Sequence, residues 1–462
     1  MASEHAQNSD YQAPPPLIEG DETYGTINDR IGGIVLEQRH PLAWLAIFAV
    51  GSLLVMAFLT STGYLLIHGV GVWGINIPVA WGWAIINLVW WIGIGHAGTL
   101  ISAILLLFHQ DWRTSINRFA ETMTIFAVMM ASLFPLLHLG RPWLFYFIMP
   151  YPSTLGMWPQ FRSPLVWDVF AINTYATVSA LFWFIGIIPD VATLRDRAKN
   201  RFAKIAYGIA ALGWRGSARH WFRYETVYII LAGLATPLVV SVHSIVSFDF
   251  AVSLLPGWHT TVFPPYFVAG AVFSGFAMVL TLTIPLRKMY NLENYITMRH
   301  INNMAKVMLA TGLVVAYGYA MEFFTGWYSG HDYEQFMLVN RLGGYYAPAF
   351  WMLILCNVIT PQLLWFSNIR SNLVVLFVIS LAVNLGMWLE RYVIVVTSLH
   401  ADFLPSSWGV YHGTIWDWLL FIGTIGLFLT MLLVFLRILP SISMFEMRHL
   451  HHKLMNHGKH HD

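Results

Sequence analysis

Two residues, His138 and Asp168, have the types and the spacing that proton-coupled chemistry needs. His138 ends one apolar run in the segment His-Leu-Gly-Arg-Pro, and Asp168 begins the next in Ser-Pro-Leu-Val-Trp-Asp. Consecutive membrane helices are antiparallel, so the two side chains can lie at similar heights. Each can bond one hydroxyl of a quinol head group and accept its proton as the electrons leave. The alternative is that each only interacts with the dipole of its own helix end, and depth in the membrane decides between the two.

Further ionisable residues lie near the ends of apolar runs on the same predicted side of the membrane. Charge buried in lipid is costly, so each of these residues is a candidate for function. Glu390 and Arg391 are neighbours on one helix and are expected to need separate partners rather than each other. Asp249 and Arg391 are predicted to line the site or to lead protons out of it, although structural pairing explains them equally well. The candidates around the quinol are Arg141, Asp249, Arg391, His243 and Glu390.

His96 lies at mid-depth in the second apolar run, within a glycine-rich stretch that suits close helix packing. We interpret it either as a proton-path residue or as a histidine bonded to a neighbouring helix. Its spacing of 13 residues from His109 resembles that of two-haem cytochromes. No second helix offers a matching pair of axial ligands, so bound haem is not expected.

The composition requires an integral membrane protein. Of the 462 residues, 57% are hydrophobic and only 10% are charged, which is far from the balance of a soluble domain. Most Lys and Arg residues fall in loops on one side, so the positive-inside rule places both termini in the cytoplasm. The single cysteine, Cys356, excludes a disulfide, a Cys-ligated iron–sulfur cluster and covalently attached haem. Ten runs of about 20 apolar residues, each long enough to span the bilayer, begin near Leu42, Trp81, Ala120, Val166, Glu225, Tyr266, Met304, Ala347, Asn372 and Trp418.

An internal repeat divides these runs. Segments 163–173 and 347–357 share Pro, Trp and Asn at one offset, and an even number of crossings separates them, so both copies have the same orientation. The second copy has Met352 where the first has Asp168, which indicates one active site, in the first copy.

The sequence predicts an all-α integral membrane protein of ten transmembrane helices, with two four-helix bundles and two peripheral helices. The predicted parts are an N-terminal cytoplasmic arm (1–40), a first peripheral helix (41–78), the first bundle (79–250), the second bundle (251–397), an outer loop with helix ten (398–440) and a His-rich cytoplasmic tail (441–462).

The chain from about Gln38 to Pro440 resembles the NrfD/PsrC family of quinone-interacting membrane subunits, and most closely the ActC subunit of bacterial alternative complex III. The resemblance rests on His138-Leu-Gly-Arg-Pro142 and Ser163-Pro-Leu-Val-Trp-Asp168 in a ten-helix chain. It implies oxidation of menaquinol or ubiquinol near the periplasmic face of a bacterial inner membrane, at a site containing His138 and Asp168. It also implies that this chain itself binds no haem or iron–sulfur cluster.

The partners that the resemblance implies are an iron–sulfur subunit, a multihaem c-type cytochrome subunit, a paralogous NrfD-like membrane subunit and, in some complexes, a terminal oxidase, with no role for nucleic acid. Some members are proposed to move protons through a bundle. The competing hypothesis is a secondary transporter, in which the outer charges bind a substrate or ion; such sites usually lie nearer the midplane. The candidate proton-path residues are His96, Asn87, Glu121, Tyr317 and Glu322.

Overall fold

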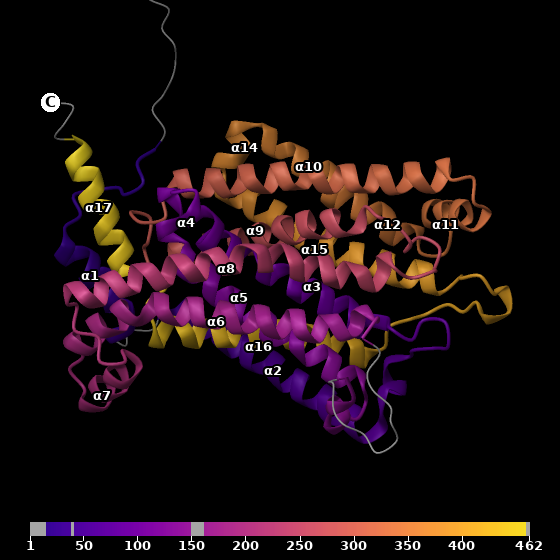
Figure 1. Cartoon of the computed structure of the whole chain (residues 1–462), viewed down its shortest axis with the longest axis horizontal. Helices are drawn as coiled ribbons and strands as arrows, with labels where there is room; N and C mark the ends of the chain where they lie inside the picture. The colour runs from indigo at the N-terminus through magenta and orange to yellow at the C-terminus, as the bar shows by residue number, and fades with distance from the viewer. Residues whose placement is uncertain (1–14, 38–40, 149–160, 459–462) are drawn as a thin grey trace, which may run out of the picture.

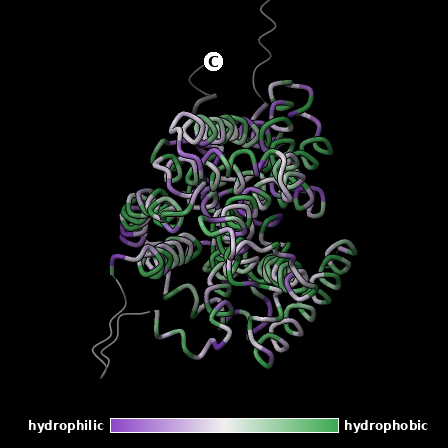
Figure 2. Tube along the Cα trace, turned by 90° about the vertical axis from the view of Figure 1, so that its right-hand side faces the viewer, coloured by the Kyte–Doolittle hydropathy of each residue, from purple (hydrophilic) through white to green (hydrophobic). Residues whose placement is uncertain are grey.

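The computed structural model describes residues 15–37, 41–148 and 161–458. In them, ten helices are long and apolar enough to cross a membrane, which confirms the ten predicted runs. The helices lie side by side along the longest axis of the molecule (Figure 1), and Figure 2 shows them end-on with hydrophobic residues around most of their circumference. The ten spans are α2 (Leu42–His68), α3 with its continuation (Gly82–Leu107), α5 (Asn117–His138), α6 (Pro164–Arg197), α8 (Ala218–Ala251), α9 (Phe263–Met289), α10 (Met298–Tyr328), α12 with its continuation (Ala347–Trp365), α15 with its continuation (Leu373–Thr397) and α16 (Ile415–Ile438).

Two groups of four helices make up the body of the protein. Helices α3, α5, α6 and α8 form the first bundle, and α9, α10, α12 and α15 form the second. Helices α3 and α9 pack against each other and join the bundles, and their most apolar windows are 83% and 72% buried, against 17% for α2. The centre of the protein is therefore the seam between the bundles, with α2 at the periphery.

The predicted repeat is visible at the start of α6 and α12. Each helix has a proline in its first turn, and the indoles of Trp167 and Trp351 donate to a backbone carbonyl of the preceding segment, at 2.6 and 3.1 Å. The third shared residue differs, because Asn173 is exposed and Asn357 is buried. The two copies thus keep a common helix start while their interiors have diverged.

Three π-helical segments interrupt the spans: η2 (Leu100–Ile104) after α3, η5 (Leu355–Ile359) within the α12 span and η7 (Val393–Thr397) after α15. A π turn holds an additional residue and so rotates the side chains that follow it; such turns are frequent at functional sites. The segment η5 carries the buried Asn357, and η7 directly follows the charged end of α15.

Glycines allow α3 to approach both of its central neighbours closely. A Cβ atom on Gly98 would lie 2.0 Å from the carbonyl oxygen of Ala120 in α5. One on Gly275 of α9 would lie 2.2 Å from the Cβ of Ala97. Small residues at such crossings permit the backbone contacts that hold membrane helices together.

Gly98→Val is accordingly expected to prevent normal assembly of the first bundle. The added side chain collides with backbone, which cannot move as a flexible side chain can, so we expect a loss of at least about 3 kcal/mol of stability. The yield of monodisperse protein, measured by fluorescence-detected size-exclusion chromatography, tests this. Gly63→Val in α2 is the matched control, since a Cβ there meets no atom within 4 Å; equal yields of the two variants would contradict the expectation.

Helices α2 and α16 pack as a pair on the outside of the bundles. A Cβ on Gly426 of α16 would lie 2.2 Å from the Cβ of Leu54 in α2, so these helices also meet at backbone distance. The hydroxyl of Ser61 donates to the carbonyl oxygen of Trp416 (2.9 Å). The pair is tied to the first bundle through α16, whose Thr424 accepts from the indole of Trp91 in α3 (3.2 Å).

Both ends of the described chain lie at one end of the bundle, which we call the terminal end; the opposite end is the far end (Figure 1). The terminal end carries three short helices, α1 (Tyr24–Leu36), α7 (Arg201–Ala210) and α17 (Met444–Gly458). The sequence had predicted only an arm and a tail for the first and last of these. Tyr24 and His452 join α1 to α17 through a hydrogen bond of 2.9 Å.

Candidate functional site

A pair of aspartates lies at the far end of the first bundle. Ser163 and Pro164 begin α6, so Asp168 falls about one turn inside the helix, and Asp249 lies close to the end of α8. Asp168 is 7% exposed, and its side chain interacts with that of Asp249. The two carboxyl groups of α6 and α8 are therefore neighbours inside the far end of the bundle.

Each carboxyl of this pair has a further oxygen available. The Oδ1 atoms of Asp168 and Asp249 are both buried and have no hydrogen-bond partner in the part of the chain that the structure describes. A buried polar atom without a partner is costly. Two such atoms together indicate a place for a ligand with hydroxyl groups.

His138 ends α5 at the same end of the bundle. Its ring lies parallel to that of Trp73, with centroids 6.3 Å apart, and its Nδ1 has no hydrogen-bond partner among the described residues. Within the described ranges, no hydrogen bond or ion pair joins His138 to Asp168, whose side chain interacts with Asp249, so a quinol bonded to both stays a prediction. The rotation of α6 turns the carboxylate toward α8, and a one-dimensional pattern does not fix that rotation.

A buried histidine pair follows deeper in the first bundle. His96 of α3 and His243 of α8 are fully buried, with ring centroids 4.4 Å apart. His96 also stacks on Tyr175 of α6 at 5.0 Å, and its Nδ1 contacts the carbonyl oxygen of Ile92 at 2.6 Å. Neither ring nitrogen of His243 has a hydrogen-bond partner among the described residues. The hydrogen bond of His96 therefore lies within its own helix, its ring touches a second titratable residue, and its part in a proton path stays a prediction.

Polar groups continue from this pair toward the terminal end. The hydroxyl of Tyr175 bonds that of Thr99 (2.8 Å) and donates to the carbonyl oxygen of Gly95 (3.1 Å). Thr124 of α5 donates to the same carbonyl at 2.5 Å. Thr124 and Glu121 are three residues apart on α5 and therefore lie on one face of that helix. The interior of the first bundle is thus polar over much of its length.

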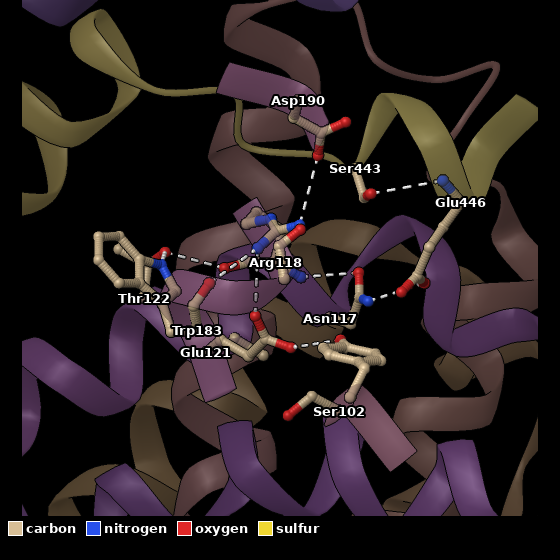
Figure 3. Close-up of polar contacts among 12 residues, drawn as sticks. Ser102, Asn117, Arg118, Glu121, Thr122, Trp183, Asp190, Ser443 and Glu446 are labelled. Atoms are coloured by element: carbon tan, nitrogen blue, oxygen red, sulfur yellow. Dashed lines mark hydrogen bonds and ion pairs between the residues drawn. The ribbon is translucent and has the colours of Figure 1, made fainter. Parts of the chain in front are cut away.

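The terminal end of the first bundle contains a buried charge cluster (Figure 3). The guanidinium of Arg118 pairs with Asp190 at 3.3 Å and with Glu121 at 3.6 Å, and it donates to the carbonyl oxygen of Gly186 at 2.6 Å. Glu121 also accepts from the hydroxyl of Tyr228 at 3.1 Å. All of these side chains are buried.

Helix α17 extends this cluster. Its Glu446 accepts from Asn117 at 2.9 Å (Figure 3). Glu446 also pairs with Arg113 at 3.2 Å. Burial on its own lowers the pKa of Arg113, but the carboxylate of Glu446 and other nearby groups more than offset this and raise the pKa above its usual value. Arg113 therefore stays charged, and the C-terminal helix supplies the charge that balances it.

This cluster corrects the prediction that the buried charges gather on one side of the membrane. The sequence placed Arg113 and Arg118 among the solvated loop cations, but Arg118 lies inside α5 and is 1% exposed. Asp190 follows Pro189, which resembled the end of a helix, yet α6 continues to Arg197. The signal that sequence reasoning missed was the i, i+3 spacing of Arg118 and Glu121 at the start of an apolar run.

A second polar centre lies in the second bundle. The hydroxyl of Tyr319 donates to Glu390 and accepts from the side-chain amide of Asn357 at 2.8 Å. Arg391 forms an ion pair with Glu390, which was not predicted, but each residue also has a separate partner as predicted: Tyr319 for Glu390 and Phe267 for Arg391. Adjacent side chains leave a helix in different directions, but the long arginine side chain bends back to reach its neighbour.

Arg391 also connects this centre to the first bundle. Its guanidinium lies 4.6 Å from the centroid of the Phe267 ring, a cation–π contact, and its charge interacts with His243. Arg391 is 3% exposed. It therefore places a positive charge at the seam between the bundles, near the histidine pair rather than at the protein surface.

The remaining predicted residues have other surroundings. Tyr317 is 62% exposed on the outer face of α10 and does not reach the polar interior. Tyr319, two residues further along the helix, does reach it and bonds Glu390. Glu322 pairs with Arg341 of α11 (Asp332–Gly343) at 2.6 Å, which ties α10 to α11. Asn87 accepts from the indole of Trp388 at 2.9 Å and ties α3 to α15. Arg141 is exposed just beyond α5.

The fold and the site define a polytopic membrane protein with a buried carboxyl pair at one end of a four-helix bundle. Residues 71–401 match the family described as "Polysulphide reductase, NrfD", a span that runs from before α3 to beyond the end of α15. The chain belongs to the NrfD family.

Two curated relatives agree with this assignment. The chain is 27% identical over 242 residues to a "Putative dimethyl sulfoxide reductase membrane" C subunit of Halobacterium salinarum, a match that covers 52% of the chain and 51% of the relative. It is 21% identical over 403 residues to the C subunit of the selenate reductase of Mesobacillus selenatarsenatis, with 82% and 89% covered. The chain thus spans about half the length of the first relative and most of the second. The chain is accordingly similar to membrane subunits of oxidoreductase complexes, and its closer likeness to ActC stays a prediction.

Proposed function

We propose that this chain is the quinol-oxidising membrane subunit of a respiratory oxidoreductase complex, of the ActC type, and that the far end of the first bundle is its site. The observation that carries the proposal is the carboxyl pair of Asp168 and Asp249, with two buried oxygens that lack a partner among the described residues. Membership of the NrfD family supports it, as do relatives named as reductase subunits.

Oxidation of one quinol to a quinone releases two protons and two electrons, and the site has two groups suited to the protons. The carboxyl pair accepts one of these protons at a free Oδ1 atom. His138 accepts the other at the unpartnered Nδ1. General bases placed in this way act as the quinol loses its electrons. The parallel ring of Trp73 beside His138 offers an apolar wall against which the quinone ring can lie.

The two electrons must leave the chain. One cysteine cannot ligate an iron–sulfur cluster, so the acceptor belongs to another subunit. We propose an iron–sulfur subunit docked at the far end, followed by a multihaem c-type cytochrome subunit, with a paralogous membrane subunit alongside. By the positive-inside rule the far end faces the periplasm, and the substrate is menaquinol or ubiquinol.

We further propose that quinol oxidation drives protons along the first bundle. His243 is six residues from Asp249 on α8, about 9 Å along the helix axis. From there, His96, Tyr175 and Thr124 extend the polar interior to Glu121.

A reduced-minus-oxidised visible spectrum of the complex isolated through this chain in mild detergent tests the proposal. Addition of menaquinol or ubiquinol is expected to produce c-type haem bands. The dimethyl ether of the same quinol, which has no hydroxyl proton to release, is the matched control and is expected to produce none. An intact complex that contains haem but does not respond to quinol would contradict the proposal. Substrate-dependent flux in proteoliposomes of this chain alone would instead favour a transporter.

A further inference from the structure

A large polar cavity opens at the terminal end, away from the site described above. It has a volume of about 1270 Å³ and lies between α1, the end of α6, α7 and the end of α16. Its walls are fixed to one another: the hydroxyl of Tyr207 donates to the carbonyl oxygen of Ile438 (2.9 Å), and Arg437 donates to that of Ile34 (3.1 Å). The cavity is therefore built by bonded elements and is not a gap between loose segments.

The cavity is positively charged. Its lining holds three cations, Arg197, Lys199 and Arg437, against the two carboxylates Asp29 and Glu37. Arg197 and Asp29 already form an ion pair with each other. Helix α7 adds Arg201 and Lys204 beside the lining residue Ala203. The excess positive charge sits at the level where the spans α6 and α16 end.

Helix α7 carries an apolar face that no part of the described chain covers. Phe202, Ile205 and Ile209 of α7, with Leu212 just beyond it, are each more than half exposed. Their spacing of three, four and three residues places them on one side of the helix. A short helix with cations on one face and large apolar side chains on the other lies in the plane of the membrane interface, with its apolar face among the acyl chains.

We propose that this cavity binds the head group of an anionic phospholipid. Basic pockets between spans, at the level of the lipid head groups, provide the charge that a phosphodiester needs. The exposed apolar face of α7 lies on the side of that helix away from the lining residues Ala203 and Tyr207, and it holds the helix at the membrane interface, where lipid head groups reach the cavity. The proposal does not depend on the quinol site, because the cavity lies at the opposite end of the bundle.

Native mass spectrometry of the full-length chain, titrated with dioleoyl-phosphatidylglycerol, tests the proposal. Lys199→Gln is expected to weaken binding by about fivefold, the effect of one cation near a lipid head group. The matched control is Arg219→Gln, which removes an exposed cation at the same end but outside the cavity. Dioleoyl-phosphatidylcholine is expected to bind weakly to every variant.

Each alternative outcome overturns the proposal. Equal phosphatidylglycerol binding by Lys199→Gln and Arg219→Gln would show that the cavity is not the site. If inorganic phosphate, at the same concentration as the lipid, displaced all the phosphatidylglycerol, the cavity would be a site for free phosphate and not for a lipid. A Phe202→Ser variant that binds phosphatidylglycerol as wild type does would remove the role of α7.

Discussion

Asp168→Asn lowers quinol-dependent turnover by about 10²- to 10⁴-fold while leaving the complex assembled; this is the largest functional effect we expect. Asparagine has nearly the same shape as aspartate, and its amide donates a hydrogen bond to Asp249, so the contact between α6 and α8 is kept. What is lost is the second carboxyl, because the amide that replaces it cannot take up a proton. Reduction of the co-isolated haem protein after rapid mixing with quinol measures the effect.

Asp332→Asn is the matched control for this prediction. Asp332 is an exposed aspartate in the first turn of α11, at the same far end of the protein. We expect wild-type turnover from it. Asp249→Asn, in contrast, is expected to lower quinol-dependent turnover as Asp168→Asn does, because each variant removes one carboxyl group of the same pair. If correctly assembled Asp168→Asn reduces haem as fast as Asp332→Asn, Asp168 is a helix-end residue and not a proton acceptor.

Arg118→Gln causes the largest loss of stability that we expect, about 3 to 5 kcal/mol. The guanidinium contacts two buried carboxylates and a backbone carbonyl, and its removal leaves Asp190 and Glu121 without a counter-charge inside the bundle. Breaking a buried pair by removing one partner is costly for this reason. The apparent melting temperature of the purified protein in detergent, followed by size-exclusion chromatography, measures the loss.

Two further variants identify charge as the cause. Arg219→Gln removes an exposed arginine at the same end of the protein and is expected to melt as wild type does. In the double variant Arg118→Gln with Asp190→Asn, one uncompensated carboxylate is neutralised, so part of the stability returns. Melting of Arg118→Gln at the temperature of Arg219→Gln would show that the cluster contributes little to stability.

The ten spans could be predicted because hydrophobic length alone determines them. Each backbone polar group must be bonded within its own segment in lipid, so an apolar run of sufficient length becomes a helix. The position of each charged residue along its helix could be predicted from the sequence, but not the direction in which its side chain points about the helix axis. Tyr317 and Tyr319 show the difference: a helix turns by about 200° between them, and only Tyr319 faces the interior.

The candidate site was predicted in part for the same reason. His138, Asp168 and Asp249 were identified because ionisable residues are rare at such helix ends. Their pairing depended on rotation about the helix axes, which put the two aspartates together. The cluster around Arg118 was missed because an arginine near the end of a run resembles a loop cation. The ion pair of Glu446 with Arg113 could not be predicted without knowing that α17 packs against the terminal end of the first bundle.

The pairing of α2 with α16 has a consequence for biogenesis. These are the first and the last membrane spans of the described chain, and they meet at glycine positions on α16. At the usual rate of synthesis, the roughly 350 residues between them take about 20 to 70 s to make. During that time the face of α2 that will contact Gly426 is covered only by lipid or by the insertion machinery. A chain whose synthesis stops before Ile415 therefore keeps a first span without its partner helix, with the face of α2 that meets Gly426 left open to lipid.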